Sequence, residues 1–144
     1  MPVRRRPPKP KTSGTAGLRW EQAADIRRRL VRIARAVGFR HVDPRRLVAV
    51  RTYGSRANAL ARIWGLSPIF QQALRLPALY VVEVMIPAFD RLSRAEQDRV
   101  LIHELLHVPI TFSGSLRPEQ SRHFRTHHTV SRLYRLYLAN RRRA

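Results

Sequence analysis

The sequence predicts a small α+β domain in which a short β-sheet packs against a helix that carries His103-Glu104-Leu105-Leu106-His107. A chain of 144 residues is long enough for one compact domain with a modest core. Apolar residues recur with helical spacing in some segments and form a β-branched run in another. A hydrophobic content of 44% excludes a chain that is disordered throughout.

The first 14 residues, MPVRRRPPKPKTSG, differ in composition from the rest of the chain. Cations and prolines dominate this segment, which has too little apolar surface to pack into a core. We therefore expect a disordered, basic, proline-rich tail over residues 1–14 and one folded domain over residues 15–144.

Three elements are predicted in the first half of the domain. Apolar side chains three and four positions apart predict an amphipathic helix over residues 18–37, which Gly38 ends in the left-handed conformation. Residues 46–53 are rich in valine and leucine and predict a β-strand. Residues 56–64 are expected to form a second helix that ends at Gly65.

The second half begins with a short helix and the strongest strand. Ser-Pro starts the helix predicted over residues 67–74. The run LYVVEVMI predicts a strand over residues 79–86, because β-branched residues favour extended backbone, and Pro87 ends it. A last helix is expected from Thr126 onwards, with its end fraying into the terminal arginines.

The helix that carries the motif has a clear beginning in the sequence. Ser93-Arg94-Ala95-Glu96 is a capping box, in which the serine hydroxyl accepts from the Glu96 amide and the Glu96 carboxylate accepts from the Ser93 amide. The predicted helix runs through Val108, since Pro109 disfavours helical geometry at the residue before it.

His103 and His107 are four residues apart, so a helix places both imidazoles on one face, where they can bind the same Zn²⁺. Glu104 is the next residue along, and a carboxylate there can take the proton of a water activated by the metal. The chain has no cysteine, so any metal must be bound by histidine and carboxylate. This pattern predicts hydrolytic zinc chemistry, and the alternative is two ordinary helix histidines beside an exposed or salt-bridged glutamate.

A catalytic zinc requires a third protein ligand. Ile110 and Ser113 stand where the metzincin continuation needs Gly and His, which excludes that branch. His123 is the first choice, because a long loop precedes it. Three further residues could be the ligand or stabilise the oxyanion: Glu119, His127 and His128. Each of these histidines could instead simply face solvent.

Two residues of the strongest predicted strand have competing interpretations. Glu83 is its only charged residue, and it could orient a ligand histidine or, as the simpler alternative, pair with an arginine. Tyr80 is expected in the core, although a tyrosine near the metal could polarise a carbonyl.

Three stretches carry a resemblance to a known family: ARIWGLSPIFQQAL with YVVEV, FDRLSRAEQDRVLIHELLHVP, and TFSGSLRP. They resemble a family of metallopeptidases found in archaea, bacteria and phages, over about residues 41–137. The resemblance implies a compact zincin-like fold, similar in style to SprT-like proteases, with a small sheet beside the metal helix. It implies His103 and His107 as ligands and Glu104 as general base. Family members often have a histidine after LRP and another shortly downstream; here Glu119 and His123 stand in these places.

The function predicted from the motif and the resemblance is a zinc-dependent metallopeptidase that acts on a protein or peptide. Two alternatives follow from the charge of +20, to which 29 cations and 9 acids contribute. One is a DNA-associated, SprT-like protease, and the other is a non-catalytic, basic nucleic-acid-binding module. The cations are spread along the chain, which favours at most non-specific nucleic-acid contacts through a basic surface. We expect no membrane partner and a cytoplasmic location, because no long apolar run or secretory signal is present.

Overall fold

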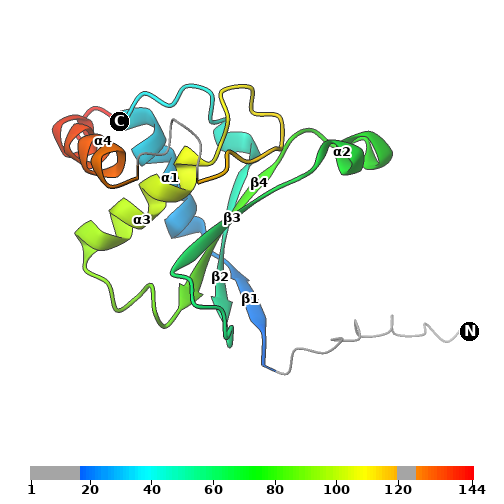
Figure 1. Cartoon of the computed structure of the whole chain (residues 1–144), viewed down its shortest axis with the longest axis horizontal. Coiled ribbons are helices and arrows are strands. Elements are labelled where there is room, and N and C mark those ends of the chain that lie inside the picture. The colour runs from blue at the N-terminus through cyan, green and yellow to red at the C-terminus, as the bar shows by residue number, and fades with distance from the viewer. Residues whose placement is uncertain (1–16, 120–125) are drawn as a thin grey trace, which may run out of the picture.

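A four-stranded β-sheet with three helices along one side forms the body of the molecule (Figure 1). The computed structural model describes residues 17–119 and 126–144. The strands are β1 (Arg19–Gln22), β2 (Leu47–Tyr53), β3 (Ala61–Gly65) and β4 (Tyr80–Ile86). The helices are α1 (Ala24–Ala36), α2 (Pro68–Leu74), α3 (Arg94–Leu106) and α4 (Thr126–Asn140), and a 3₁₀ turn spans Pro44–Arg46. The predicted α+β class is confirmed.

The strand order in the sheet is β1-β2-β4-β3. The central pair, β2 and β4, is parallel, and the two edge strands pair antiparallel with it. Side chains alternate between the two faces of a strand. Ala49 and Val82 are register partners, as are Val82 and Ile63, and all three are buried on the face that packs against α1 and α3. The opposite, outer face bears the side chains of the intervening residues.

The helix expected from residue 18 begins later, at Ala24, because residues 19–22 form β1. Trp20 suits helical spacing, but it pairs with Thr52 of β2, and its indole Nε1 donates to Glu83 at 3.4 Å. These partners are far along the chain, so local periodicity could not reveal them. The prediction of Gly38 as the left-handed residue after α1 is confirmed by its φ of +78°.

The prediction of a helix over residues 56–64 is wrong, because Ala61–Gly65 is strand β3. Ala61 and Ile63 are buried while Trp64 is exposed, which is the period of two that a strand requires. Pairing with β4 therefore overrides the helical spacing seen in the sequence. Gly65 does not cap a helix; a Cβ there would lie 2.0 Å from the carbonyl oxygen of Gly114, so only glycine allows this loop to approach the strand.

The remaining predicted elements are confirmed within one or two residues. They are the strands over 46–53 and 79–86 and the helices from 67, 93 and 126, with α3 ending at Leu106 rather than Val108. None of the helices in the described ranges is long and apolar enough to cross a bilayer.

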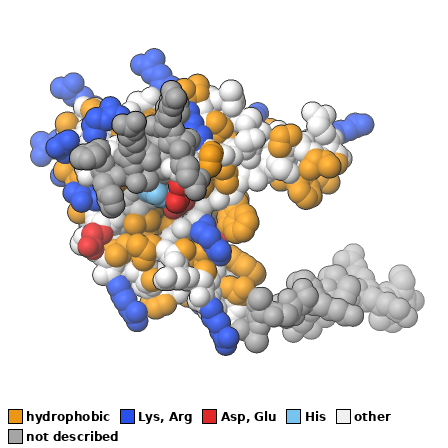
Figure 2. Space-filling view, viewed as in Figure 1, with side chains coloured by type: hydrophobic (Ala, Val, Ile, Leu, Met, Phe, Trp, Pro, Cys, Tyr) orange, Lys and Arg blue, Asp and Glu red, His pale blue; other side chains and the backbone are white. Residues whose placement is uncertain are grey.

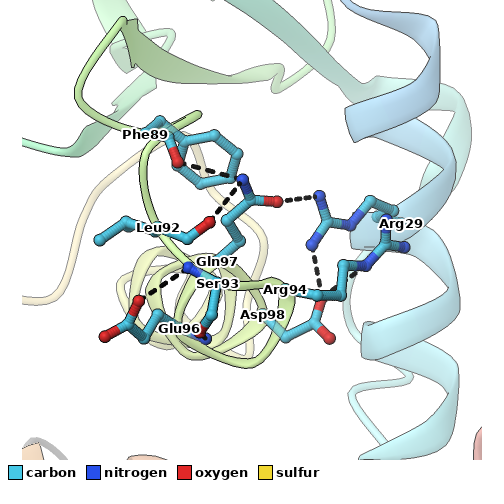
Figure 3. Close-up of polar contacts among 8 residues, drawn as sticks. All are labelled: Arg29, Phe89, Leu92, Ser93, Arg94, Glu96, Gln97 and Asp98. Atoms are coloured by element: carbon cyan, nitrogen blue, oxygen red, sulfur yellow. Dashed lines mark hydrogen bonds and ion pairs between the residues drawn. The ribbon is translucent and has the colours of Figure 1, made fainter.

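The start of α3 is attached to α1 and to the preceding loop (Figure 3). The capping box is present, with Glu96 accepting from the Ser93 amide at 2.7 Å. Arg29 of α1 donates to the buried Asp98 at 2.7 Å and to Gln97 at 2.8 Å. These contacts fix the position and direction of the helix that carries the motif.

Candidate metal centre

His103 and His107 lie on successive turns of α3, with their ring centroids 5.3 Å apart and their planes at 76°. Both residues are half-buried. The buried neighbours Leu101, Ile102 and Leu105 hold this part of α3 in the core. The helix therefore presents both imidazoles at the edge of the packed interior, as the four-residue spacing predicts.

Glu119 joins the two histidines from the loop that follows α3. Its Oε1 atom lies 3.4 Å from Nε2 of His103. One ligand atom from each of His103, His107 and Glu119 lies within 4.8 Å of the other two. Two ligands about 2.1 Å from a tetrahedral zinc are about 3.4 Å apart. The donor set and the His103–Glu119 spacing therefore fit a zinc ion.

The ring of His107 is oriented by the main chain of Arg117. Its Nδ1 atom lies 2.6 Å from the Arg117 carbonyl oxygen, which can only accept, so Nδ1 carries the hydrogen. The Arg117 amide donates in return to the His107 carbonyl at 2.7 Å. This tautomer leaves Nε2 as the electron-pair donor, the arrangement typical of metal-binding histidines.

Two side chains, Tyr80 and Gln71, hold the loop between α3 and Glu119 in place. The sequence did not predict this role for either of them. The Tyr80 hydroxyl accepts from the Gly114 amide and donates to the Ser115 carbonyl, both at 2.8 Å. The Gln71 amide nitrogen donates to the Ser113 carbonyl at 2.7 Å. Tyr80 is thus a core residue, as expected, and its hydroxyl also holds the loop that carries Glu119.

Glu104 is buried beside the two histidines, at 7% exposure. Burial, together with the negative charge of Glu119, raises the pKa of Glu104 to about 7 in the protein without metal. Burial, and next the neighbouring His107, lowers the pKa of His103, while Glu119 opposes that shift. A neutral imidazole is the form that binds a metal.

A groove of about 620 Å³ opens beside Glu104. Its walls come from the start of β3, from α3 and from α4, with Leu60, Arg99, His103, Glu104 and Val130 among the lining residues. Figure 2 shows a histidine and an acidic side chain next to each other at the surface on this side of the molecule. The arrangement can hold a metal next to a buried carboxylate at the wall of a surface groove.

A protein-family model described as putative phage metallopeptidase matches residues 18–137. The chain belongs to this family. The match covers every described strand and most of the helical residues, and it confirms the resemblance found in the sequence. Membership of a metallopeptidase family implies a metal and a peptide substrate. No curated protein and no solved structure gives a significant match.

Three of the histidines and carboxylates predicted for the metallopeptidase site come together in the described residues: His103, His107 and Glu119. His123, the first choice for the third ligand, lies outside the described residues. His127 and His128 belong to α4, and their side chains are not among those described. All the metal-ligand assignments, including that of the third ligand, therefore stay predictions.

Glu83 lies on the outer face of the sheet and accepts from four side chains. The donors are Thr52 at 2.6 Å, Trp64 at 2.9 Å, Arg62 at 3.2 Å and Trp20 at 3.4 Å. Burial raises the pKa of Glu83, but these hydrogen bonds and the Arg62 charge outweigh it and hold the pKa below its ordinary value. The simpler interpretation, a buried strand glutamate paired with an arginine, is confirmed.

Proposed function

We propose that this chain is a zinc-dependent peptidase in which His103 and His107 bind the metal and Glu104 is the general base. The observation that carries the proposal is the grouping of the His103, His107 and Glu119 ligand atoms within 4.8 Å, next to a buried glutamate and a groove. The third ligand is His123 or Glu119, with His127 and His128 as further candidates. The family description supports the peptidase activity.

Hydrolysis of a peptide bond forms one C–O bond and breaks one C–N bond. A bound zinc would supply Lewis-acid polarisation of the carbonyl and a lower pKa for water. Glu104 would accept a proton from the attacking water and deliver it to the nitrogen of the leaving amine. The buried position of Glu104 limits its motion and keeps its carboxylate at the groove wall.

The edge of β3 offers a binding surface for an extended peptide at the same groove. The Leu60 carbonyl accepts from the Met85 amide of β4, so the polar main-chain groups of Ala61 and Ile63 point away from β4. An open sheet edge can pair with an extended chain through main-chain hydrogen bonds. Such pairing would lay the scissile bond across the groove. Because it uses main-chain groups, it would depend little on the side chains of the substrate.

The test is metal content and casein cleavage of wild type and of Glu104→Gln. We expect about one zinc in both proteins and a loss of activity of about 10²–10⁴-fold in the variant. Glu21→Gln, on exposed β1, is the matched control and should keep full activity. A wild type that holds no metal after purification with zinc, or a variant as active as wild type, would disprove the proposal.

The two nucleic-acid functions remain alternatives from composition. The described residues give neither of them specific support, and the family description points to a peptidase. Casein cleavage that requires DNA would favour the DNA-associated protease.

A further inference from the structure

Helix α2 projects from the body of the molecule (Figure 1). From Pro68 to Pro77 every residue is exposed except Gln71, which is half-buried. Ile69, Phe70 and Leu74 are 73%, 55% and 59% exposed. Figure 2 shows hydrophobic side chains gathered on this arm and a cationic side chain at its tip. Large apolar side chains clustered on a protrusion mark an interaction site.

The protrusion is an ordered element. Gln71, on its inner side, donates from Nε2 to the Leu66 and Ser113 carbonyls, both at 2.7 Å. Arg75 ends the helix in the left-handed conformation, and the Leu76 amide donates to the Gln71 carbonyl at 3.0 Å. Polar contacts thus hold the base of the arm, while its apolar side chains point outwards without packing on the core.

The strand that leads into α2 extends this apolar surface. Trp64 of β3 is 55% exposed and Trp20 of β1 is 58% exposed, both on the outer face of the sheet. Their indole N–H groups both donate to the Glu83 carboxylate, and both side chains nevertheless stay more than half exposed. Tryptophan has an apolar body with one polar group, and it concentrates where water meets lipid.

The charge around α2 favours an anionic partner. The chain has no acidic residue between Asp43 and Glu83, and Glu83 is paired with Arg62. Arg75 stands at the end of the helix, and the whole chain carries +20. This charge would repel a second copy of the chain, and apolar side chains contribute little to binding a phosphate backbone. An anionic lipid surface fits both the positive charge and the exposed apolar side chains, because it attracts arginines and its interfacial region accommodates apolar groups.

We propose that α2 inserts its apolar side chains into the interfacial region of a bilayer that contains anionic lipid, with Trp64 and Trp20 at the boundary. The docking is peripheral, so it needs no spanning helix, but it departs from the expectation of no membrane partner. It would bring the groove to substrates at a membrane surface, and it is independent of the zinc chemistry.

The absence of cysteine allows a single reporter group to be placed. Leu74→Cys, labelled with the environment-sensitive dye NBD, is mixed with vesicles of phosphatidylcholine and phosphatidylglycerol. The expected result is a blue shift of the emission and quenching by brominated lipid. Leu138→Cys carries the control label, since Leu138 is also an exposed leucine but lies on α4, which is far from α2 at the other end of the molecule in Figure 1. That label should not respond, and a response at 138 equal to that at 74 would overturn the proposal.

Net charge would by itself attract the chain to such vesicles, so the apolar contribution needs its own variant. Phe70→Ser combined with Leu74→Ser should lower partitioning into the anionic vesicles by about tenfold or more. Leu138→Ser is the matched control and should bind as wild type does. Both side chains of the double variant are exposed, so the fold should survive, as circular dichroism would verify. Binding of the double variant equal to that of wild type would overturn the proposal. So would a blue shift at position 74 that appears without vesicles and grows with protein concentration, because it would show that a second copy of the chain covers α2.

Discussion

Arg117 contacts His107 through both of its main-chain polar groups. Its carbonyl accepts from Nδ1 of His107 at 2.6 Å, and its amide donates to the His107 carbonyl at 2.7 Å. The contact orients one of the candidate ligand histidines through a residue that is not itself a candidate ligand. Such partners commonly change metal affinity by about 10–100-fold when they are lost.

Because the contact uses main-chain atoms, the choice of substitution at position 117 matters. Arg117→Pro removes the donating amide, and we expect zinc affinity to fall by about 10–100-fold. Arg117→Ala keeps both main-chain groups and should bind zinc as wild type does. Competition against a metal-sensitive chelating dye measures both affinities. Equal affinities for the two variants would show that the main-chain contact does not orient His107.

If the proposed zinc site is correct, its third ligand can be identified by comparing Glu119→Gln with His123→Ala. Removing a ligand should weaken zinc binding by more than about a hundredfold, beyond the effect of an outer contact. Glu119 lies 3.4 Å from His103, so we expect a measurable loss for Glu119→Gln in either case. The variant with the larger loss identifies the ligand. If neither variant loses affinity, His127 and His128 become the candidates.

Arg99 lines the groove, and its guanidinium lies over the Tyr134 ring at 4.8 Å from the ring centroid. If the proposed peptidase activity is correct, this charge should favour an acidic side chain in the substrate. Arg99→Glu should shift the preference between acidic and basic peptides by about fivefold, which is typical of one exposed charge pair. Cleavage of a peptide library measures the shift. Arg91→Glu, outside the groove, should leave the preference unchanged.

The buried pair of Arg29 and Asp98 fixes α3 against α1. Asp98→Ala leaves a buried guanidinium without its carboxylate, so we expect the free energy of unfolding to fall by about 3 kcal/mol. Urea denaturation measures the change, with Asp90→Ala as the exposed control. The combined change Arg29→Met with Asp98→Leu should recover much of the loss, because it removes both charges. A single variant as stable as wild type would contradict this assignment.

The Asp25–Arg51 pair predicts a dependence of stability on pH. The hydrogen bond from Arg51 lowers the pKa of Asp25 from 3.8 to about 2. The folded state therefore favours the ionised carboxylate. The stabilisation that the pair adds to the free energy of unfolding is present above pH 3.8 and is lost as the pH falls toward 2. The contribution stays below about 1 kcal/mol, because the pair is half-exposed and screened.

Asp25→Asn should be less stable than wild type at about pH 6 and closer to it at about pH 3. Urea denaturation at both pH values measures the difference. A difference that is constant between the two would exclude a titrating Asp25. Other carboxylates titrate in both proteins, so they cancel in the comparison.

The sequence by itself determined the elements whose signals are local. The capping box from Ser93 to Glu96 starts α3, and the β-branched run becomes β4, because each depends on neighbouring residues. The four-residue spacing of His103 and His107 also needs only a helix to put both rings on one face.

Tertiary structure decided the rest. Residues 19–22 and 61–65 are strands because they pair with β2 and β4, which lie far away in the chain. Glu119 reaches His103, and Arg117 orients His107, because Tyr80 and Gln71 hold the intervening loop through contacts of long sequence separation. Hydrophobic spacing indicates which side chains are buried but not which distant segment covers them. Contacts between distant segments are what bring Glu119 and Arg117 to the two histidines.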